Sequence, residues 1–146
     1  MTTLITGGTG FIGSRLALDC AARGEDVKIL AKINNDNEQS GYDELRKAGV
    51  QLINGDVCKA ATAASAMKEV KTLYHLAAAQ HEANVDDDYF RRINVEGTRT
   101  ILDAAVEEGV DRVVHGSTIG VYGMADEGPV HDRTPLFPDN IYGETK

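Results

Sequence analysis

The sequence lacks the features that mark several classes of protein. It has no cluster or stripe of lysine and arginine and carries a formal net charge of −8, so nucleic acid is a poor candidate partner. No stretch reaches the roughly 18 consecutive apolar residues of a membrane span, and the first residues do not form a charged segment followed by a cleavable apolar one. We therefore expect a soluble, cytoplasmic protein that binds neither nucleic acid nor a membrane.

Cysteine is also scarce. Cys20 and Cys58 fall in a predicted helix and just after a predicted strand, outside any CxxC or metal-ligand spacing. We interpret both as reduced structural thiols and predict no metal site. Repeats and low-complexity segments are absent, and 146 residues of which 42% are hydrophobic are enough to bury the core of one domain.

What the sequence does contain is an alternation of strand-length apolar runs with segments of helical period. Strands are predicted at residues 3–6, 27–31, 51–54, 72–76 and 112–116. Helices are predicted near residues 11–23, 42–48, 60–68 and 89–108, with a polar surface loop at 33–41. This order predicts an α/β fold, a Rossmann-type doubly wound parallel sheet. Because such sheets usually have a further strand, and a new helix begins near Lys146, we expect the fold to be incomplete at its C-terminus.

The segment TGGTGFIG joins the first predicted strand to the first predicted helix. In that context Gly7 permits a sharp turn, Gly10 lets the backbone approach a phosphate, and Gly13 lets the helix pack closely. The amides of Phe11 and Ile12 would face a pyrophosphate with the positive end of the helix dipole. The sequence therefore predicts an NAD(P)-binding domain over residues 1–146 and NAD or NADP as the cofactor.

The residues after the second predicted strand bear on the choice between NAD and NADP. An acid here would bond the ribose 2′-hydroxyl, but Ala31 stands at that place and Lys32, next to it, could meet a 2′-phosphate as a point charge. This slightly favours NADP. A solvated surface lysine is the alternative, and Asp36 would restore the preference for NAD if the following loop folds back.

The GxxGxxG spacing of Gly7, Gly10 and Gly13 resembles that of the extended short-chain dehydrogenase/reductase superfamily. Within it, the resemblance is to the NAD(P)-dependent nucleotide-sugar epimerase/dehydratase family. Three further segments agree with that family: Asp56-Val57, His75-Leu76-Ala77-Ala78 and Asn94-Val95-Glu96-Gly97-Thr98. The resemblance implies that the cofactor is contacted by Asp56, Val57, Leu76, Ala77, Ala78 and Asn94. We interpret His75 as a strand-end histidine with its hydrogen bonds satisfied.

A YxxxK pair, Tyr142 and Lys146, supplies the candidate chemistry. At i and i+4 the two side chains share one helix face, and a nearby ammonium favours the phenolate and lowers the tyrosine pKa. Alone, the pattern is also that of an ordinary helix pair. The resemblance extends to Ser117-Thr118 and Val121-Tyr122-Gly123, and it implies that Thr118 bonds the substrate oxygen, that Tyr142 moves its proton and that Lys146 also binds the cofactor ribose. Ser117 competes with Thr118 for its role.

The same resemblance separates several reactions. Sugar 4,6-dehydratases of the superfamily place an Asp-Glu pair after the catalytic threonine, where this chain has Ile119 and Gly120, so we disfavour a dehydratase. Asp126 and Glu127 are interpreted as solvated loop acids. The proline-punctuated approach over residues 129–142 resembles nucleotide-sugar epimerases, whereas the acidic run at 86–88 also suits steroid-dehydrogenase-like or flavonol-reductase-like ketone reductases.

These patterns lead to three functional hypotheses. The first is an NAD(P)-dependent epimerase or oxidoreductase that acts on a nucleotide-linked sugar by hydride transfer at a ring hydroxyl or ketone. The second is a 3β-hydroxysteroid-dehydrogenase-like or flavonol-reductase-like ketone reductase, and the third is a non-catalytic protein that senses the cofactor. The resemblance further implies a homodimer of the full-length protein and a substrate region beyond residue 146.

Overall fold

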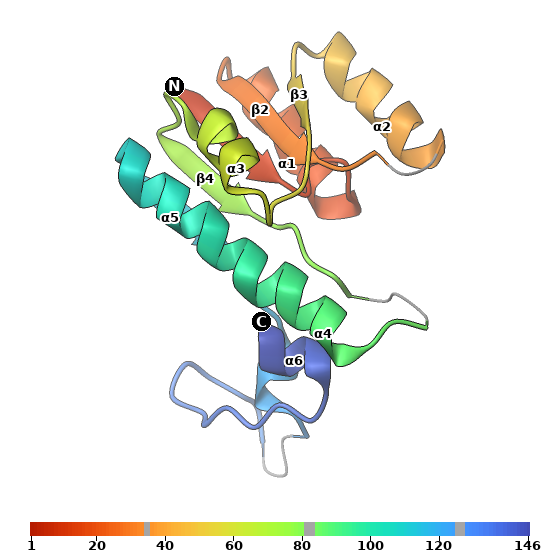
Figure 1. Ribbon diagram of the computed structural model, residues 1–146. Coiled ribbons are helices and arrows are strands. Elements are labelled where there is room, and N and C mark those ends of the chain that lie inside the picture. The colour runs from red at the N-terminus through yellow and green to blue at the C-terminus, as the bar shows by residue number, and fades with distance from the viewer. Residues whose placement is uncertain (34–35, 81–83, 125–127) are drawn as a thin grey trace.

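The computed structural model describes residues 1–33, 36–80, 84–124 and 128–146, with the backbone alone at 36–38. These residues form a parallel sheet in the strand order β3-β2-β1-β4-β5 (Figure 1). The strands are β1 (Thr2–Thr6), β2 (Asp26–Ala31), β3 (Gln51–Asn54), β4 (Thr72–His75) and β5 (Arg112–His115). Each agrees with its predicted range to within one residue at either end. The Rossmann-type parallel sheet that the sequence predicts is confirmed.

Helices cover both faces of this sheet (Figure 1). The α-helices are α1 (Phe11–Ala22), α2 (Asp36–Lys47), α3 (Ala60–Met67), α4 (Asp87–Phe90), α5 (Thr98–Glu108) and α6 (Ile141–Thr145). A π-helical segment, η1 (Arg91–Gly97), joins α4 to α5, and a 3₁₀-helix, η2 (Ile119–Tyr122), follows β5. No helix in the described ranges combines the length and the apolar character needed to cross a membrane.

Two cores, one on each face, hold the sheet in place. Successive strand residues point to opposite faces, so Leu4 packs in the core formed with α3 and α5, while Ile5 packs in the core formed with α1 and α2. Leu30 and Ile29 of β2 alternate in the same way, and all four side chains are fully buried. Burying each one contributes about 1.5–3 kcal/mol. The central strands therefore form a rigid base for whatever follows their carboxyl ends.

The predicted loop at residues 33–41 is partly wrong, because α2 begins at Asp36 rather than near Tyr42. The first turns of α2 are polar and give no apolar periodicity, while Leu45, in its last turns, is buried in the core and anchors the helix. Residues 34–35 of that loop lie outside the described part.

The helix predicted at residues 89–108 is also more complex than the sequence indicates. It starts two residues earlier, with the Asp86 carboxylate accepting a hydrogen bond from Tyr89 N at 3.0 Å, and it widens to a π-helix over Arg91–Gly97. Asp86 is a favourable N-cap residue because its side chain satisfies a free amide of the first turn. The widened turn has no equivalent signature in the sequence.

Candidate functional site

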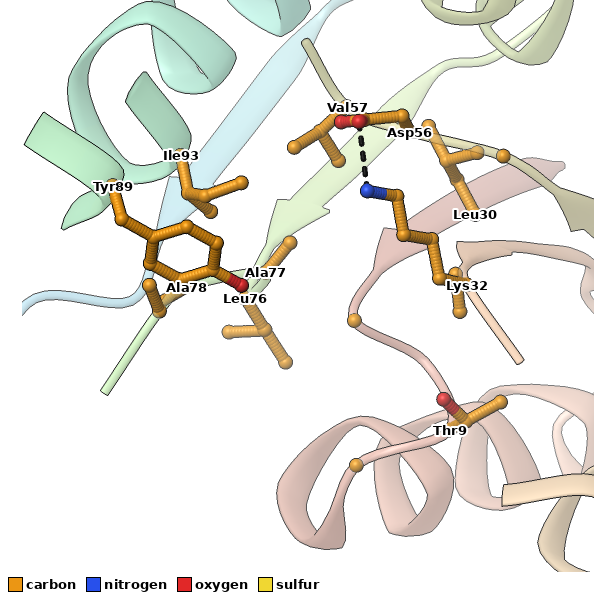
Figure 2. A pocket seen from close by; sticks show the side chains of 15 residues that line it. Thr9, Leu30, Lys32, Asp56, Val57, Leu76, Ala77, Ala78, Tyr89 and Ile93 are labelled. Atoms are coloured by element: carbon orange, nitrogen blue, oxygen red, sulfur yellow. Dashed lines mark ion pairs between the residues drawn. The ribbon is translucent and has the colours of Figure 1, made fainter. Parts of the chain in front are cut away.

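A cavity of about 290 Å³ opens beside the carboxyl ends of β1, β2 and β4 (Figure 2). The chain leaves β1 toward β2 on one side and reaches β4 on the other, so the cavity lies at the point where the strand order reverses. Open α/β sheets bind ligands at this position. The lining residues are Gly7, Thr9, Gly10, Leu30, Ala31, Lys32, Gly55, Asp56, Val57, Leu76, Ala77, Ala78, Ala79, Tyr89 and Ile93.

The glycine turn forms one side of the cavity, and close contacts at Gly7 and Gly13 leave no room for a side chain at either position. Gly7 has a φ of 68°, and a Cβ there would lie 2.9 Å from the Ala77 nitrogen. A Cβ on Gly13 would collide with the Gly7 carbonyl oxygen, because α1 packs directly on the turn. A sharp turn at Gly7 and close packing at Gly13 are what the sequence predicts for these residues.

The first turn of α1 can offer backbone amides rather than side chains. Gly10 occupies the N-cap position, where no side chain caps the helix. The first amides of a helix have no intrahelical partners, so those of Phe11 and Ile12 remain candidates for an anion. Their side chains are 94% and 68% exposed, and neither residue is among the described residues that line the cavity.

An ion pair crosses the opposite side of the cavity. Lys32 Nζ, just after β2, lies 2.7 Å from Asp56 Oδ2, just after β3 (Figure 2). Burial raises the pKa of Asp56, but the bonds from Lys32 and from the Cys58 amide outweigh it and lower the pKa to about 2. Lys32, which the sequence offers as a partner for a 2′-phosphate, thus already has a carboxylate partner. The side chain of Asp36, the alternative, lies outside the described part.

The segment after β4 is tied to the end of β1 by one hydroxyl. Thr6 Oγ1 accepts hydrogen bonds from the amides of Leu76 and Ala77, both at 3.1 Å, and lies 2.7 Å from His75 Nδ1. Because these two amides occupy its lone pairs, the Thr6 hydroxyl donates its hydrogen to His75 Nδ1. The imidazole proton is then on Nε2, which lies 2.8 Å from Thr98 Oγ1. This geometry fixes Leu76, Ala77 and Ala78 at the cavity wall.

His75 itself is fully buried, and both ring nitrogens have partners. Burial, with smaller contributions from the positive charges of His115 and Lys146, lowers its pKa to about 4. The ring also stacks on His115 with 5.5 Å between centroids. The interpretation of His75 as a satisfied strand-end histidine is confirmed.

Asn94 connects elements instead of lining the cavity. Its Oδ1 accepts from Ala79 N at 2.8 Å, and its Nδ2 donates to Ala79 O at 3.0 Å and to Thr145 Oγ1 at 2.9 Å. The side chain is 2% exposed, so the whole amide is engaged inside the protein. In this structure the Asn94 amide positions Ala79 and α6, and the cofactor contact that the resemblance implies for it stays a prediction.

The candidate catalytic residues lie beyond β5, on two elements that pack together. A Cβ on Gly143 of α6 would lie 2.5 Å from the Gly120 carbonyl oxygen of η2, so the two helices approach at their backbones. Thr118 caps η2 by accepting a hydrogen bond from Gly120 N at 3.1 Å, and Ser117 Oγ donates to the Lys146 carbonyl at 3.4 Å. The structure thus brings together the segments that carry Thr118, Tyr142 and Lys146, none of which is among the described residues lining the cavity.

The electrostatics of the YxxxK pair differ from the prediction. Burial raises the pKa of the Tyr142 phenol, the opposite of the lowering expected from Lys146, and burial lowers the pKa of Lys146. Desolvation disfavours both charged forms. Burial is the cause of both shifts.

The sequence missed several wall residues, among them Thr9, Ala79, Tyr89 and Ile93. Thr9 sits inside the glycine turn, and Tyr89 and Ile93 are four residues apart, so helical spacing could have placed both on one face.

Asp126 and Glu127 lie outside the described residues. Cys20 and Cys58 are free thiols, and within the described ranges no group of His, Cys, Asp or Glu is arranged to hold a metal ion.

Comparison with known proteins places this site in a family. Residues 3–146 match the NAD dependent epimerase/dehydratase family, and the chain belongs to it. Over its whole length the chain is 34% identical to the sterol demethylase protein B of Methylococcus capsulatus and covers 44% of that protein. Over 98% of its length it is 35% identical to the UDP-glucose 4-epimerase of Rhizobium meliloti, covering 43% of it. The chain thus spans less than half the length of these relatives.

A solved structure agrees with both fold and family. The dTDP-glucose 4,6-dehydratase of Streptomyces venezuelae, in a crystal structure with NAD bound, superposes with a TM-score of 0.86 at 32% identity. The match covers 100% of this chain and 48% of that one. The resemblance to the extended short-chain dehydrogenases that the sequence motifs indicate is confirmed.

Proposed function

We propose that residues 1–146 form the cofactor-binding Rossmann domain of an NAD-dependent enzyme that transfers hydride at a ring hydroxyl or ketone of a nucleotide-linked sugar. The cavity at the strand-order reversal carries the proposal, because it combines the glycine turn with Asp56 and the segment after β4 in one site. The solved relative with bound NAD supports NAD as the cofactor. The ion pair of Lys32 with Asp56 is a reason to propose NAD ahead of the NADP that Lys32 alone suggested.

In this proposal the first amides of α1 and the glycine turn bind the pyrophosphate, and Asp56 and Val57 lie toward the adenine. When bound, the nicotinamide supplies the hydride acceptor or donor. Tyr142 gives or takes the proton of the substrate oxygen through its phenol, and the Lys146 ammonium, which is half-buried, supplies positive charge nearby. Thr118 donates a hydrogen bond to the same oxygen.

The hydrogen bonds of the turn support Thr118 over Ser117 for that last role. Thr118 Oγ1 accepts from Gly120 N, which leaves its hydroxyl hydrogen available for a substrate oxygen. Ser117 Oγ instead donates a long, exposed hydrogen bond of 3.4 Å to the Lys146 carbonyl. The two neighbouring hydroxyls are thus in different donor states.

We further propose epimerisation or simple oxidoreduction ahead of dehydration. Water elimination needs an acid and a base next to the sugar ring, yet Ile119 and Gly120 follow Thr118 and neither side chain can exchange a proton. An epimerase returns the hydride to the sugar and leaves the cofactor unchanged overall, whereas a dehydrogenase accumulates NADH. The amount of NADH formed therefore distinguishes an epimerase from a dehydrogenase.

The test is the Tyr142→Phe variant of the full-length protein, with UDP-glucose and dTDP-glucose as probe substrates. Chromatography of the products detects epimer and dehydrated sugar, and absorbance detects net NADH. The variant should lose turnover by about 10²–10⁴-fold, while its affinity for NAD stays within about threefold of the wild type. Full turnover by Tyr142→Phe would refute the role of the phenol.

A ketone reductase acting on a steroid-like substrate is the second candidate, supported by the 34% identity to the sterol demethylase protein B. It would consume NADH or NADPH with a ketone and leave both nucleotide sugars untouched. A cofactor-sensing protein would bind NAD tightly and change none of these substrates. The presence of Tyr142 with Lys146 favours an enzyme over the sensor.

We also propose that the full-length protein is a homodimer that associates through α5. Leu102 and Val106 of α5 are 38% and 80% exposed, so this helix presents apolar side chains on its outer face. Light scattering of the wild type and of Val106→Glu tests this: the wild type should be dimeric and the variant monomeric.

A further inference from the structure

Lys32 and Asp56 are the two charged side chains among the described residues that line the cavity. They meet because β2 and β3 pair in parallel with Ala31 opposite Asn54, so both follow their strands at the same edge of the sheet. The resulting pair is electrically neutral, and its nitrogen and oxygen are 2.7 Å apart. The cavity therefore holds one internal ion pair at its β2–β3 end.

The two partners are not held equally firmly. The Asp56 side chain is 16% exposed and is fixed by a second bond, because Cys58 N donates to Asp56 Oδ1 at 2.9 Å. The Lys32 side chain is 46% exposed and ends a flexible four-carbon stem. If the pair opens, Lys32 is thus the partner that moves.

Which groups could contact the 2′ position of a cofactor ribose at this end of the cavity depends on whether Lys32 moves. Ala31, at the end of β2, has no side-chain oxygen for a 2′-hydroxyl, so this position lacks the acid that favours NAD in other Rossmann folds. A 2′-phosphate would attract the Lys32 ammonium, but only in competition with Asp56.

We propose that Asp56 is a specificity-determining residue that holds Lys32 away from the 2′-position of the cofactor and thereby limits the affinity for NADP relative to NAD. This inference rests on the proposed nicotinamide dinucleotide site. It assigns the preference to an ion pair between two strand ends instead of to a single residue after β2.

The experiment measures dissociation constants of NAD and NADP by calorimetric titration of the full-length protein and of Asp56→Asn, Lys32→Met and the double variant. The Asp56→Asn change removes the charge yet keeps a side-chain oxygen for the Cys58 amide, so the fold should be retained, which circular dichroism checks. Matched controls are Asp26→Asn and Lys28→Met, both on β2 and outside the cavity lining. They should change the ratio of the two affinities by less than about twofold.

For Asp56→Asn we expect the affinity for NADP relative to NAD to rise about tenfold, equivalent to ~1.4 kcal/mol. In the double variant this gain should disappear, because the freed ammonium is no longer present. An unchanged ratio in Asp56→Asn, with both dinucleotides bound, would overturn the inference and leave the proposed function standing. A gain that persists in the double variant would also overturn it, since direct repulsion by Asp56 would then explain the preference. If the wild type binds neither dinucleotide, the proposed function itself fails.

Discussion

The glycine turn and the catalytic turn, residues 117–123 with the proposed catalytic hydroxyl of Thr118, are held in place in different ways. The glycine turn follows β1, whose Leu4 and Ile5 are fully buried, and its backbone contacts are so close that Gly7 and Gly13 cannot carry side chains. The catalytic turn follows β5, and there Thr118 Oγ1 accepts a hydrogen bond from Gly120 N at 3.1 Å and so caps η2. Backbone packing therefore positions one turn, and a capping hydrogen bond positions the other.

The difference shows which forces set each geometry. At the glycine turn, van der Waals contact between backbones fixes the atoms, so any added atom must disturb the fold. At the catalytic turn, a few capping hydrogen bonds such as Thr118 with Gly120 fix the hydroxyls. Substitutions in the first region should therefore change folding and cofactor binding together, whereas those in the second should change chemistry alone.

Gly13→Ala should produce the largest combined effect. The added Cβ collides with the Gly7 carbonyl, so we expect the free energy of unfolding to fall by about 1–3 kcal/mol and the affinity for NAD to fall on the order of 100-fold, or ~2.7 kcal/mol. Urea denaturation measures the free energy of unfolding, and titration with NAD measures the affinity. Gly41→Ala is the control, because a Cβ there meets nothing within 4 Å and α2 should gain about 0.5–1 kcal/mol. A Gly13→Ala protein with normal stability and affinity would contradict the packing argument.

Thr118→Val tests the other side of the comparison. It keeps the shape of the side chain and removes the hydroxyl, and we expect kcat to fall on the order of 100-fold, as for the loss of one donor to a developing charge. Stability should change by less than about 1 kcal/mol, because one half-buried capping bond is lost. Ser117→Ala should lower kcat much less, since that hydroxyl donates to the chain itself. If Ser117→Ala is the more damaging change, the roles of the two hydroxyls must be exchanged.

His75 connects the two regions and should make stability depend on pH. Its pKa of about 4 in the folded chain lies below the ordinary 6.5, so the unfolded chain binds the proton first as the pH falls. The contribution of neutral His75 to the free energy of unfolding is complete above about pH 6.5 and is lost as the pH falls toward 4. Between pH 7 and pH 5 the free energy of unfolding should fall by ~2 kcal/mol. His115 and Lys146 act on the same group and remain in the His75→Gln variant. Its unfolding free energy should vary less over that interval, and an equal variation would show that His75 is not the titrating group.

Much of the fold could be predicted because local sequence carries it. The strands are short apolar runs, and the turn after β1 needs glycine for backbone reasons that hold in any tertiary context. The start of α2 was missed because Asp36 begins a polar segment without periodicity, and the π-helical turn was missed because widening a helix requires no particular residue.

The candidate site was predictable to a lesser degree, since its decisive contacts join distant segments. In the sequence Lys32 is a free cation, and only the register of β2 and β3 places Asp56 beside it. The sequence offers Asn94 as a candidate cofactor ligand, and only the folded chain shows that its amide bonds to Ala79 and Thr145. Burial likewise reversed the expected pKa of Tyr142. In each case the residue type predicts which bonds or proton transfers the side chain can make. Only the tertiary contacts show which partners it has.

The smallest expected effect concerns how α6, which carries Tyr142, is attached to η1. Arg91 Nη2 lies 3.0 Å from Glu144 Oε2, but the two side chains are 52% and 46% exposed. Water and salt screen such a pair, so a double-mutant cycle with Arg91→Ala and Glu144→Ala should give a coupling of about 0.2–1 kcal/mol that vanishes at high salt. The buried bond from Asn94 to Thr145 would then be the main polar attachment of α6. A coupling well above that range would instead assign the position of Tyr142 to a surface ion pair, and turnover of the full-length protein would then fall with ionic strength.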